Sequence, residues 1–96
     1  MNTVAAVFAS SGGGLSSRRY ISSRGLAVLG YESGRVEIWD VRYPSAAMVA
    51  LEAHQSAVLA IDYSAERQLL LTADGEGTMH VWPIPTADEL VAGAGV

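Results

Sequence analysis

Short apolar runs separated by turn-forming residues are the main pattern along this chain. Residues 35–39, Arg-Val-Glu-Ile-Trp, alternate polar and apolar side chains, as a half-buried strand of an antiparallel sheet does. Residues that suit tight bends, such as those at 32–34 and 74–77, separate the runs. The pattern therefore predicts an all-β chain of antiparallel strands. The expected strands lie near residues 3–9, 26–31, 35–40, 46–51, 57–63, 68–73 and 77–82.

The two tryptophans end two similar segments of the chain. Residues 26–39 (LAVLGYESGRVEIW) align with residues 69–82 (LLLTADGEGTMHVW), and Trp39 and Trp82 lie 43 residues apart. An internal repeat of this length is typical of architectures in which each unit packs against its neighbours.

A first strand is expected before each of these segments. Residues 4–10 and 58–64 share the pattern Val-x-x-(Val/Ile)-x-x-Ser. This alignment leaves about 11 extra residues in the first copy, in a stretch rich in Gly, Ser and Arg. We therefore expect a flexible surface insertion at residues 11–24.

The end of the chain departs from the repeat. Pro83 and Pro85 discourage a continuing strand. Residues 86–89, Thr-Ala-Asp-Glu, could form the capping box of a short helix. The alternative is a poor outer strand over residues 89–94, and we favour a frayed tail.

Two short motifs in the chain resemble those of a known family. Residues 34–40, Gly-Arg-Val-Glu-Ile-Trp-Asp, are similar to the end of a WD repeat, and Ala53-His54 resembles the Gly-His pair of the next repeat. The resemblance covers about residues 3–83 and implies antiparallel four-stranded blades of a WD-repeat β-propeller, in a partial ring. It implies a first blade at 3–45 with the insertion 11–24, an outer strand plus second blade at 46–83, and a C-terminal tail at 84–96.

The resemblance also implies a hydrogen-bonded network of His, Ser/Thr, Asp and Trp within a blade. His54, Thr72 and Trp82 take three of these positions in the second blade. Glu76 takes the Asp position, with one methylene more.

In the first blade the resemblance is limited to the end of the motif. Trp39-Asp40 is intact, but Leu29 and Ser33 take other network positions, and no histidine precedes the first strand. The network of the second blade is therefore not expected in the first.

Two blades alone would leave two broad apolar sheet faces open to water. A propeller ring has typically four to eight blades, each packed between neighbours. We therefore expect the chain to complete its ring with copies of itself or with another chain, or to be a segment of a longer protein.

Composition narrows the range of functions. The formal net charge of −4 argues against a broad nucleic-acid footprint. The chain has no cysteine, which excludes disulfides and thiolate metal sites. The apolar residues come in short runs, such as residues 69–71, that are far too short to span a membrane.

Candidate catalytic and metal-binding residues are few. His54 and Ser56, with Asp62 or Asp74, have the residue types of a hydrolase triad, but no nucleophile elbow surrounds the serine. His54 and His80 are the two histidines and lie on different predicted elements, which argues against a metal site. We expect no catalytic, cofactor or metal site, and no enzyme activity.

The predicted insertion carries the candidate anion-binding chemistry. Residues 12–14 are three glycines, but no phosphate-loop spacing follows them. Arg18, Arg19 and Arg24, with Tyr20, could instead grip a phosphate or an acidic peptide.

The amino-terminal region also has the composition of a targeting segment. Residues 1–31 contain no acidic residue, three arginines and many serines, which is typical of an organelle transit peptide. Residues 17–19, Ser-Arg-Arg, resemble a twin-arginine signal, but the following apolar stretch is short. We expect an intracellular protein, cytoplasmic or nuclear, with organelle import as the alternative.

The function most consistent with the chain is a non-enzymatic protein–protein interaction scaffold. The alternative is an anion- or RNA-contacting subunit of a larger particle. Partners are expected on exposed loops of a rigid frame, including residues 55–56 and 74–76, where Tyr and Arg are the better anchors. The expected contact residues are Arg18, Arg19, Tyr20, Arg24, Tyr31, Arg35, Arg42 and Tyr43.

Overall fold

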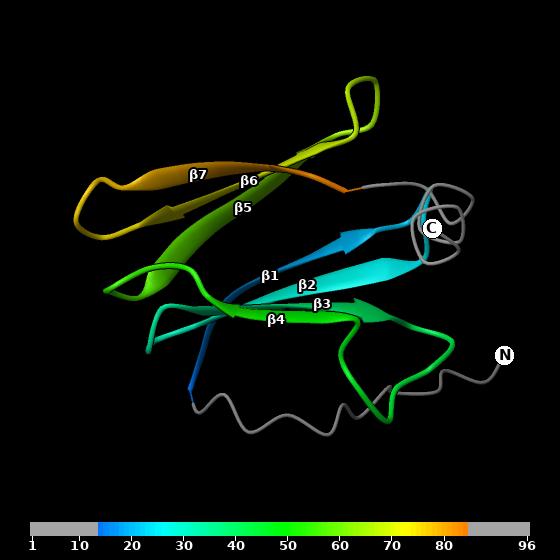
Figure 1. Ribbon diagram of the computed structural model, residues 1–96, viewed down its shortest axis with the longest axis horizontal. Helices are drawn as coiled ribbons and strands as arrows, with labels where there is room; N and C mark the ends of the chain where they lie inside the picture. The colour runs from blue at the N-terminus through cyan, green and yellow to red at the C-terminus, as the bar shows by residue number, and fades with distance from the viewer. Residues whose placement is uncertain (1–13, 85–96) are drawn as a thin grey trace, which may run out of the picture.

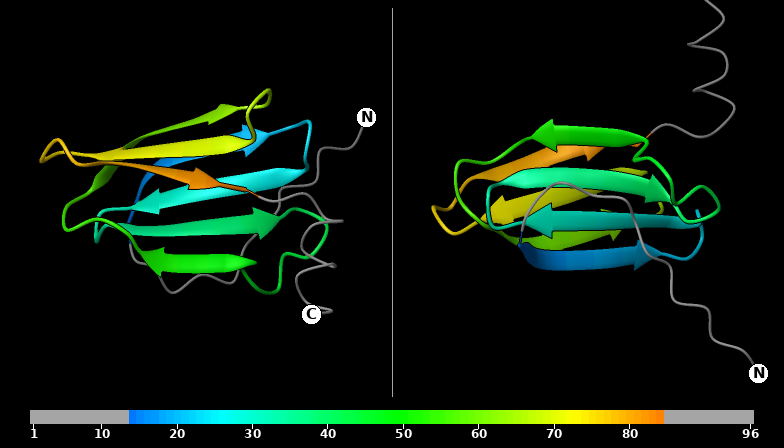
Figure 2. Two further views of the ribbon diagram at one scale, coloured as in Figure 1. Left: turned by 45° about the horizontal axis from the view of Figure 1, so that its top comes forward. Right: turned by 90° about the horizontal axis from the view of Figure 1, so that it is seen from below.

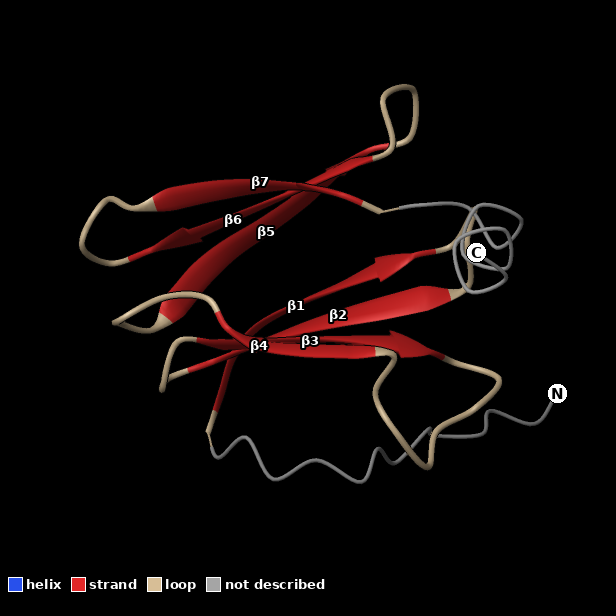
Figure 3. Cartoon of the chain, viewed as in Figure 1, coloured by secondary structure: helices blue, strands red, loops and turns tan. Residues whose placement is uncertain are grey.

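The computed structural model describes residues 14–84 of the chain. These residues form seven antiparallel strands in two sheets, without a helix (Figures 1 and 3). The all-β antiparallel fold predicted from the sequence is confirmed. Within this part of the chain there is accordingly no helix of the length and apolarity needed to cross a membrane.

The strands follow one another in the order of the sequence within each sheet. We call the four-stranded sheet, in the order β1-β2-β3-β4, sheet A, and the three-stranded sheet, in the order β5-β6-β7, sheet B. Sheet A contains β1 (Leu15–Ile21), β2 (Leu26–Tyr31), β3 (Arg35–Asp40) and β4 (Val49–Glu52). Sheet B contains β5 (Val58–Ser64), β6 (Leu69–Asp74) and β7 (Met79–Pro83).

The predicted boundaries agree closely with the observed strands where the sequence is apolar. The strands predicted at 26–31 and 35–40 are β2 and β3 without a shift, and the other four within residues 14–84 are displaced by one to three residues at their ends. The strand predicted at 3–9 lies outside the described residues.

The two sheets are built from the same unit, repeated 43 residues apart. Strands β1 and β5 start at residues 15 and 58, and strands β2 and β6 start at residues 26 and 69. The register irregularity of β1, between Leu15 and Ser17, returns in β5 between Val58 and Ala60. Left-handed backbone conformations recur at the same interval, at Gly25 and Gln68 and at Gly34 and Gly77.

The predicted surface insertion at residues 11–24 is wrong, because it contains β1. Strand β1 was not predicted because it has no apolar run. Several of its side chains make polar contacts with β5 instead. The hydroxyls of Ser16 and Ser17 both donate to the carbonyl oxygen of Val58, at 2.6 and 2.8 Å. Arg19 lies 3.3 Å from the carboxylate of Asp62. The repeat therefore needs no insertion between its first two strands.

The main core lies between the sheets, which face each other (Figure 2). Its best-buried side chains include Val28 and Val36 from sheet A and Val58 and Leu70 from sheet B. Gly30 in β2 lets Val58 of β5 come close to its backbone, because a Cβ at residue 30 would stand 2.7 Å from Cβ and Cγ1 of Val58. Strand β5 therefore lies directly against β1 and β2.

A second apolar cluster lies on the opposite face of sheet A. It consists of Ala27, Leu29, Tyr31 and Trp39, all buried, with Val41 and Ala47 packed against them. The expectation that both outer sheet faces would be open is therefore wrong for sheet A.

Gly34 joins the β2–β3 turn to the loop that leads into β5. Its N–H donates to the carbonyl of Tyr31, and its own carbonyl accepts from the N–H of His54, both at 3.0 Å. Its φ of 92° lies in the left-handed region, and an added Cβ would stand 1.9 Å from the His54 carbonyl oxygen. Only glycine meets both conditions.

We expect Gly34→Ala to destabilise the chain far more than Gly77→Ala. Gly77 has a similar φ of 88° but open space around a Cβ, so its substitution costs only the backbone strain, about 1–2 kcal/mol. At Gly34 the steric overlap adds roughly 1–3 kcal/mol. Urea unfolding of both variants measures the difference, and equal losses would contradict the loop contact.

Candidate interaction site

A hydrogen-bonded chain of four side chains links the elements of sheet B to the preceding loop. His54 Nδ1 lies 2.8 Å from Oδ2 of Asp74, and His54 Nε2 lies 2.8 Å from Oγ1 of Thr72. Trp82 Nε1 donates to the same Thr72 oxygen at 3.1 Å. With the proton on Nδ1, His54 donates to Asp74 and accepts from the Thr72 hydroxyl, so every polar atom has a suitable partner.

The acid of this network is Asp74, and the assignment of Glu76 was wrong. Asp74 ends β6 and points back toward His54, and its other carboxylate oxygen accepts the backbone N–H groups of Glu76 and Thr78. Glu76 lies in the turn, where only its backbone takes part. An acid that both closes the turn and reaches the histidine must stand before the turn. The motif alignment had placed this acid two residues late, at Glu76.

The Asp74 carboxyl is held ionised by its hydrogen bonds. Burial acts to raise its pKa, but the hydrogen bonds from His54 and from the N–H groups of Thr78 and Glu76 outweigh burial, so its pKa lies below the ordinary value. A buried acid with three donors rigidifies the β6–β7 turn.

In sheet A, the indole N–H of the tryptophan donates to a different kind of acceptor, a buried carboxylate. Glu37 is 2% exposed, and its Oε1 accepts hydrogen bonds from Trp39 Nε1 at 3.0 Å and from Tyr31 Oη at 2.8 Å. Its Oε2 accepts from Arg35 Nε at 2.9 Å, and Arg35 also reaches Glu52 at 2.8 Å. The sequence motif missed Glu37, because in the repeat it corresponds to His80 and not to a network position.

At the end of β3, Asp40 binds Arg42 instead of a blade network. The Arg42 guanidinium and its backbone N–H donate to the carboxylate, and these bonds lower the pKa of Asp40 to about 2. Arg42 also lies over the ring of Tyr43, with 5.7 Å between the guanidinium carbon and the ring centroid. Tyr43 itself is 64% exposed.

The arginines expected to form an anion site are not gathered together. Arg19 faces Asp62, and Arg24 donates from Nη1 to Tyr63 Oη at 3.1 Å and to the Ile84 carbonyl at 3.0 Å. Arg24 thus ties sheet A to sheet B. Arg18 is exposed on β1 and pairs in register with Leu29.

Two further contact residues are buried or paired inside the fold. Tyr31 is 4% exposed and bound to Glu37, so its prediction as a surface contact was wrong. Arg35 is engaged by two carboxylates. Tyr20 and the Arg42-Tyr43 pair do lie on the surface, as expected.

The hydrolase and metal candidates find no support in the geometry of the described residues. Both ring nitrogens of His54 are used by Asp74 and Thr72, and the buried Ser56 Oγ has no hydrogen-bond partner. His80 lies edge-on to His54, with ring centroids 4.8 Å apart. Within residues 14–84 no cluster of three or more metal-ligating side chains is formed.

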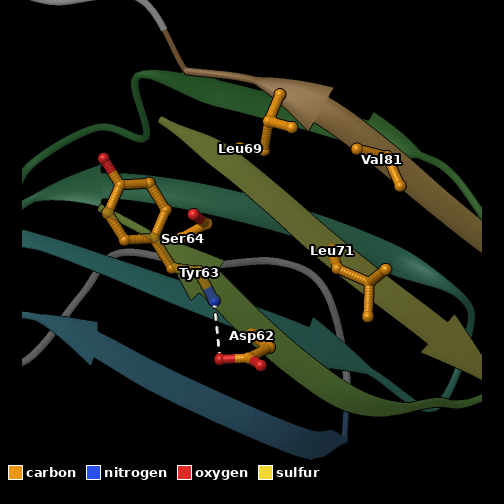
Figure 4. A pocket seen from close by; sticks show the side chains of 6 residues that line it. All are labelled: Asp62, Tyr63, Ser64, Leu69, Leu71 and Val81. Atoms are coloured by element: carbon orange, nitrogen blue, oxygen red, sulfur yellow. Dashed lines mark hydrogen bonds between the residues drawn. The ribbon is translucent and has the colours of Figure 1, made fainter. Parts of the chain in front are cut away.

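The outer face of sheet B is an open apolar surface. Leu69 and Leu71 of β6 and Val81 of β7 line a shallow hollow on it, bounded by Asp62 and Ser64 of β5 (Figure 4). Val81 is 59% exposed, and Met79, at the start of β7, is 60% exposed. We call this surface the outer face of sheet B.

This outer face repeats the composition of the face that sheet A buries. At a spacing of 43 residues, Leu69, Leu71, Met79 and Val81 correspond to Leu26, Val28, Val36 and Ile38. The earlier four belong to the core between the sheets, where sheet B covers them. The equivalent surface one unit later carries the same kinds of apolar side chain, and no sheet within the described residues covers it.

Comparison with known proteins adds information on the fold alone. No protein-family model matches the chain, and no curated protein does. Among solved structures, the computationally designed Ika4 protein matches with a TM-score of 0.62 and 21% identity, over 74% of this chain and 41% of that chain. The computationally designed Ika8 protein matches with the same TM-score and identity, over 73% of this chain and 20% of its own.

Both designed proteins are therefore much longer than the part that this chain matches. Their likeness supports the same class of fold, two packed antiparallel sheets.

Glu37→Gln is expected to destabilise the chain by about 1–3 kcal/mol, because a buried amide cannot accept three hydrogen bonds in the same geometry. Glu52→Gln is the control, since it removes the exposed carboxylate on the same Arg35 and should cost less than about 1 kcal/mol. Denaturant unfolding measures both. Similar losses would show that the buried network contributes little.

Asp74 should make stability fall in acid. Its pKa is lowered by folding, so the stabilisation is present above the unfolded pKa and is lost as pH falls through the folded pKa. Asp74→Asn should therefore be less stable near neutral pH and lose less stability on acidification below about pH 4. Glu66→Gln, at an exposed turn position, serves as the control. If the free energy of unfolding fell with pH in the same way for Asp74→Asn and the wild type, Asp74 would not be the source of the acid sensitivity.

Proposed function

We propose that this chain is a non-enzymatic protein–protein interaction scaffold, a WD-type propeller segment that completes its ring by self-association or with another chain. The repeat of 43 residues and the His54, Thr72, Asp74 and Trp82 network support the WD-type assignment. The absence of cysteine supports an intracellular setting.

One observation carries this proposal, the open outer face of sheet B. Met79 and Val81 are exposed there, whereas Val36 and Ile38, their counterparts in sheet A, are 2% and 7% exposed under a packed sheet. Burial of apolar area contributes about 25 cal/mol per Å². Monomeric proteins seldom leave a broad apolar face in water, and such faces commonly mark interaction sites.

Of the two outer sheet faces within residues 14–84, that of sheet B is open, because Leu29 and Trp39 on the outer face of sheet A are buried. Two copies that meet through this face alone would form a two-fold pair, whereas a ring built from copies needs a second contact surface on each copy. A sheet from another chain could cover the same surface. In either case the contact is sheet on sheet, with apolar side chains interdigitating over about 10 Å.

The rival function, an anion- or RNA-contacting subunit, receives less support. Arg19 and Arg24 already hold β1 and its turn against sheet B through Asp62, Tyr63 and Ile84. Arg19 is therefore paired at the surface and Arg24 is turned toward sheet B, so the arginines do not form one cluster that could neutralise several phosphates.

Val81→Glu should abolish association of the chain, because it places a charge in the centre of the apolar face. Tyr43→Glu is the matched control, since Tyr43 is as exposed but lies in the β3–β4 loop. Native mass spectrometry over a range of micromolar concentrations should show assemblies for the wild type and Tyr43→Glu and monomers for Val81→Glu. A wild type that stays monomeric throughout would contradict self-association through this face.

A further inference from the structure

Sheet B has an open edge where sheet A has a fourth strand. In sheet A, β3 pairs with β4, whereas β7 is the last strand of sheet B in the described residues. The Thr78 carbonyl and the Ile84 N–H both bond toward β6. Because backbone groups alternate along an antiparallel strand, residues 79, 81 and 83 point theirs away from β6, toward the open edge.

Along Met79 and Val81 the edge carries no charged residue that would discourage pairing, and the proline protects only its end. Natural edge strands commonly carry charged residues, which β7 (Met-His-Val-Trp-Pro) does not have. Pro83 stands at an outward position, where its missing N–H takes nothing from the ladder with β6. Met79 and Val81 thus offer two N–H groups and two carbonyls to an incoming strand.

An apolar groove lies beside this edge. Its volume is about 510 Å³, and it runs between β4 and the end of β7. Val49 and Leu51 of β4 pair in register with Ile38 and Val36, so their side chains point to the same side, toward sheet B. Across the groove stands Trp82, and Ile38, Met48, Pro83 and Ile84 complete the lining.

The sister sheet shows what kind of segment fits such an edge. In sheet A, the outer strand β4 places Val49 and Leu51 at alternate positions. The residues 43 positions after β4 are Ala92, Gly93, Ala94 and Gly95. Alanine and glycine have no side chain that could fill the groove, and glycine in a strand costs roughly 0.5–1 kcal/mol relative to alanine.

We propose that the β7 edge and the adjoining groove bind an extended segment of a partner polypeptide, about five residues long, with large apolar side chains at alternate positions. The partner strand pairs with the backbone of Met79 and Val81 and directs its apolar side chains toward Val49 and Leu51. This mode of recognition combines main-chain hydrogen bonds with pockets for alternate side chains. The inference rests on the proposed interaction function and names the form of the partner.

Amide exchange in the full chain tests this proposal with a defined probe. A synthetic peptide with the β4 sequence, residues 47–53 (AMVALEA), supplies the required alternation. Before the peptide is added, the amides of Met79 and Val81 should exchange fast, and those of His80 and Trp82 slowly. Saturating peptide should slow Met79 and Val81 by at least about tenfold.

Two matched controls make the result specific. The same peptide with serine at both apolar positions should give no protection, and Leu51→Ser in the protein should weaken binding of the original peptide at least about tenfold, since the groove loses its apolar wall. Protection of Met79 and Val81 before any peptide is added would show that the edge is already paired, and would overturn the proposal. Equal protection by the serine peptide, or none by the apolar peptide, would also overturn it.

Failure of this proposal can be told from failure of the proposed function. Leu51→Ser changes the groove but not the outer face of sheet B, so it should leave self-association intact. Val81→Glu changes the outer face, while the backbone of residue 81 remains able to pair with the peptide.

Discussion

The contact between β5 and sheet A holds the two halves of this molecule together. Gly30 has no side chain, and Val58 fills the space that a Cβ would need. At the same place the hydroxyls of Ser16 and Ser17 donate to the carbonyl of Val58, beside the register irregularity between Val58 and Ala60 of β5. Apolar packing and hydrogen-bond satisfaction thus act together at one point, and the position of sheet B relative to sheet A follows from it.

The two sheets satisfy the indole N–H of a tryptophan with different chemistry, for the buried Trp39 in sheet A and the partly buried Trp82 in sheet B. In sheet B, Trp82 donates to Thr72, and the chain of bonds ends at an ionised aspartate. In sheet A, Leu29 stands where Thr72 would be, so no hydroxyl is present, and Glu37 beside the tryptophan accepts the bond instead. The donor of the indole is satisfied in both cases, which is the condition that a buried polar atom imposes.

Most of the fold could be predicted from the sequence, because β2, β3 and β6 are apolar runs bounded by turn residues. Strand β1 could not, since Ser16, Ser17 and Arg19 make it look like a surface loop until β5 is placed beside it. The histidine, threonine and tryptophan of the network were expected from the resemblance to a WD repeat, and the structure bonds them to one another. The acid was assigned two residues late, because turn geometry and not spacing decides which carboxylate reaches His54.

The central claim is that sheets A and B pack face to face as successive units of one repeat. Nuclear Overhauser contacts between the α-protons of Gly30 and the methyl groups of Val58 test it most directly. We predict strong contacts, because a Cβ at residue 30 would stand 2.7 Å from Val58 Cγ1. Their absence, with cross-strand contacts intact inside each sheet, would show that the sheets form but do not pack on each other.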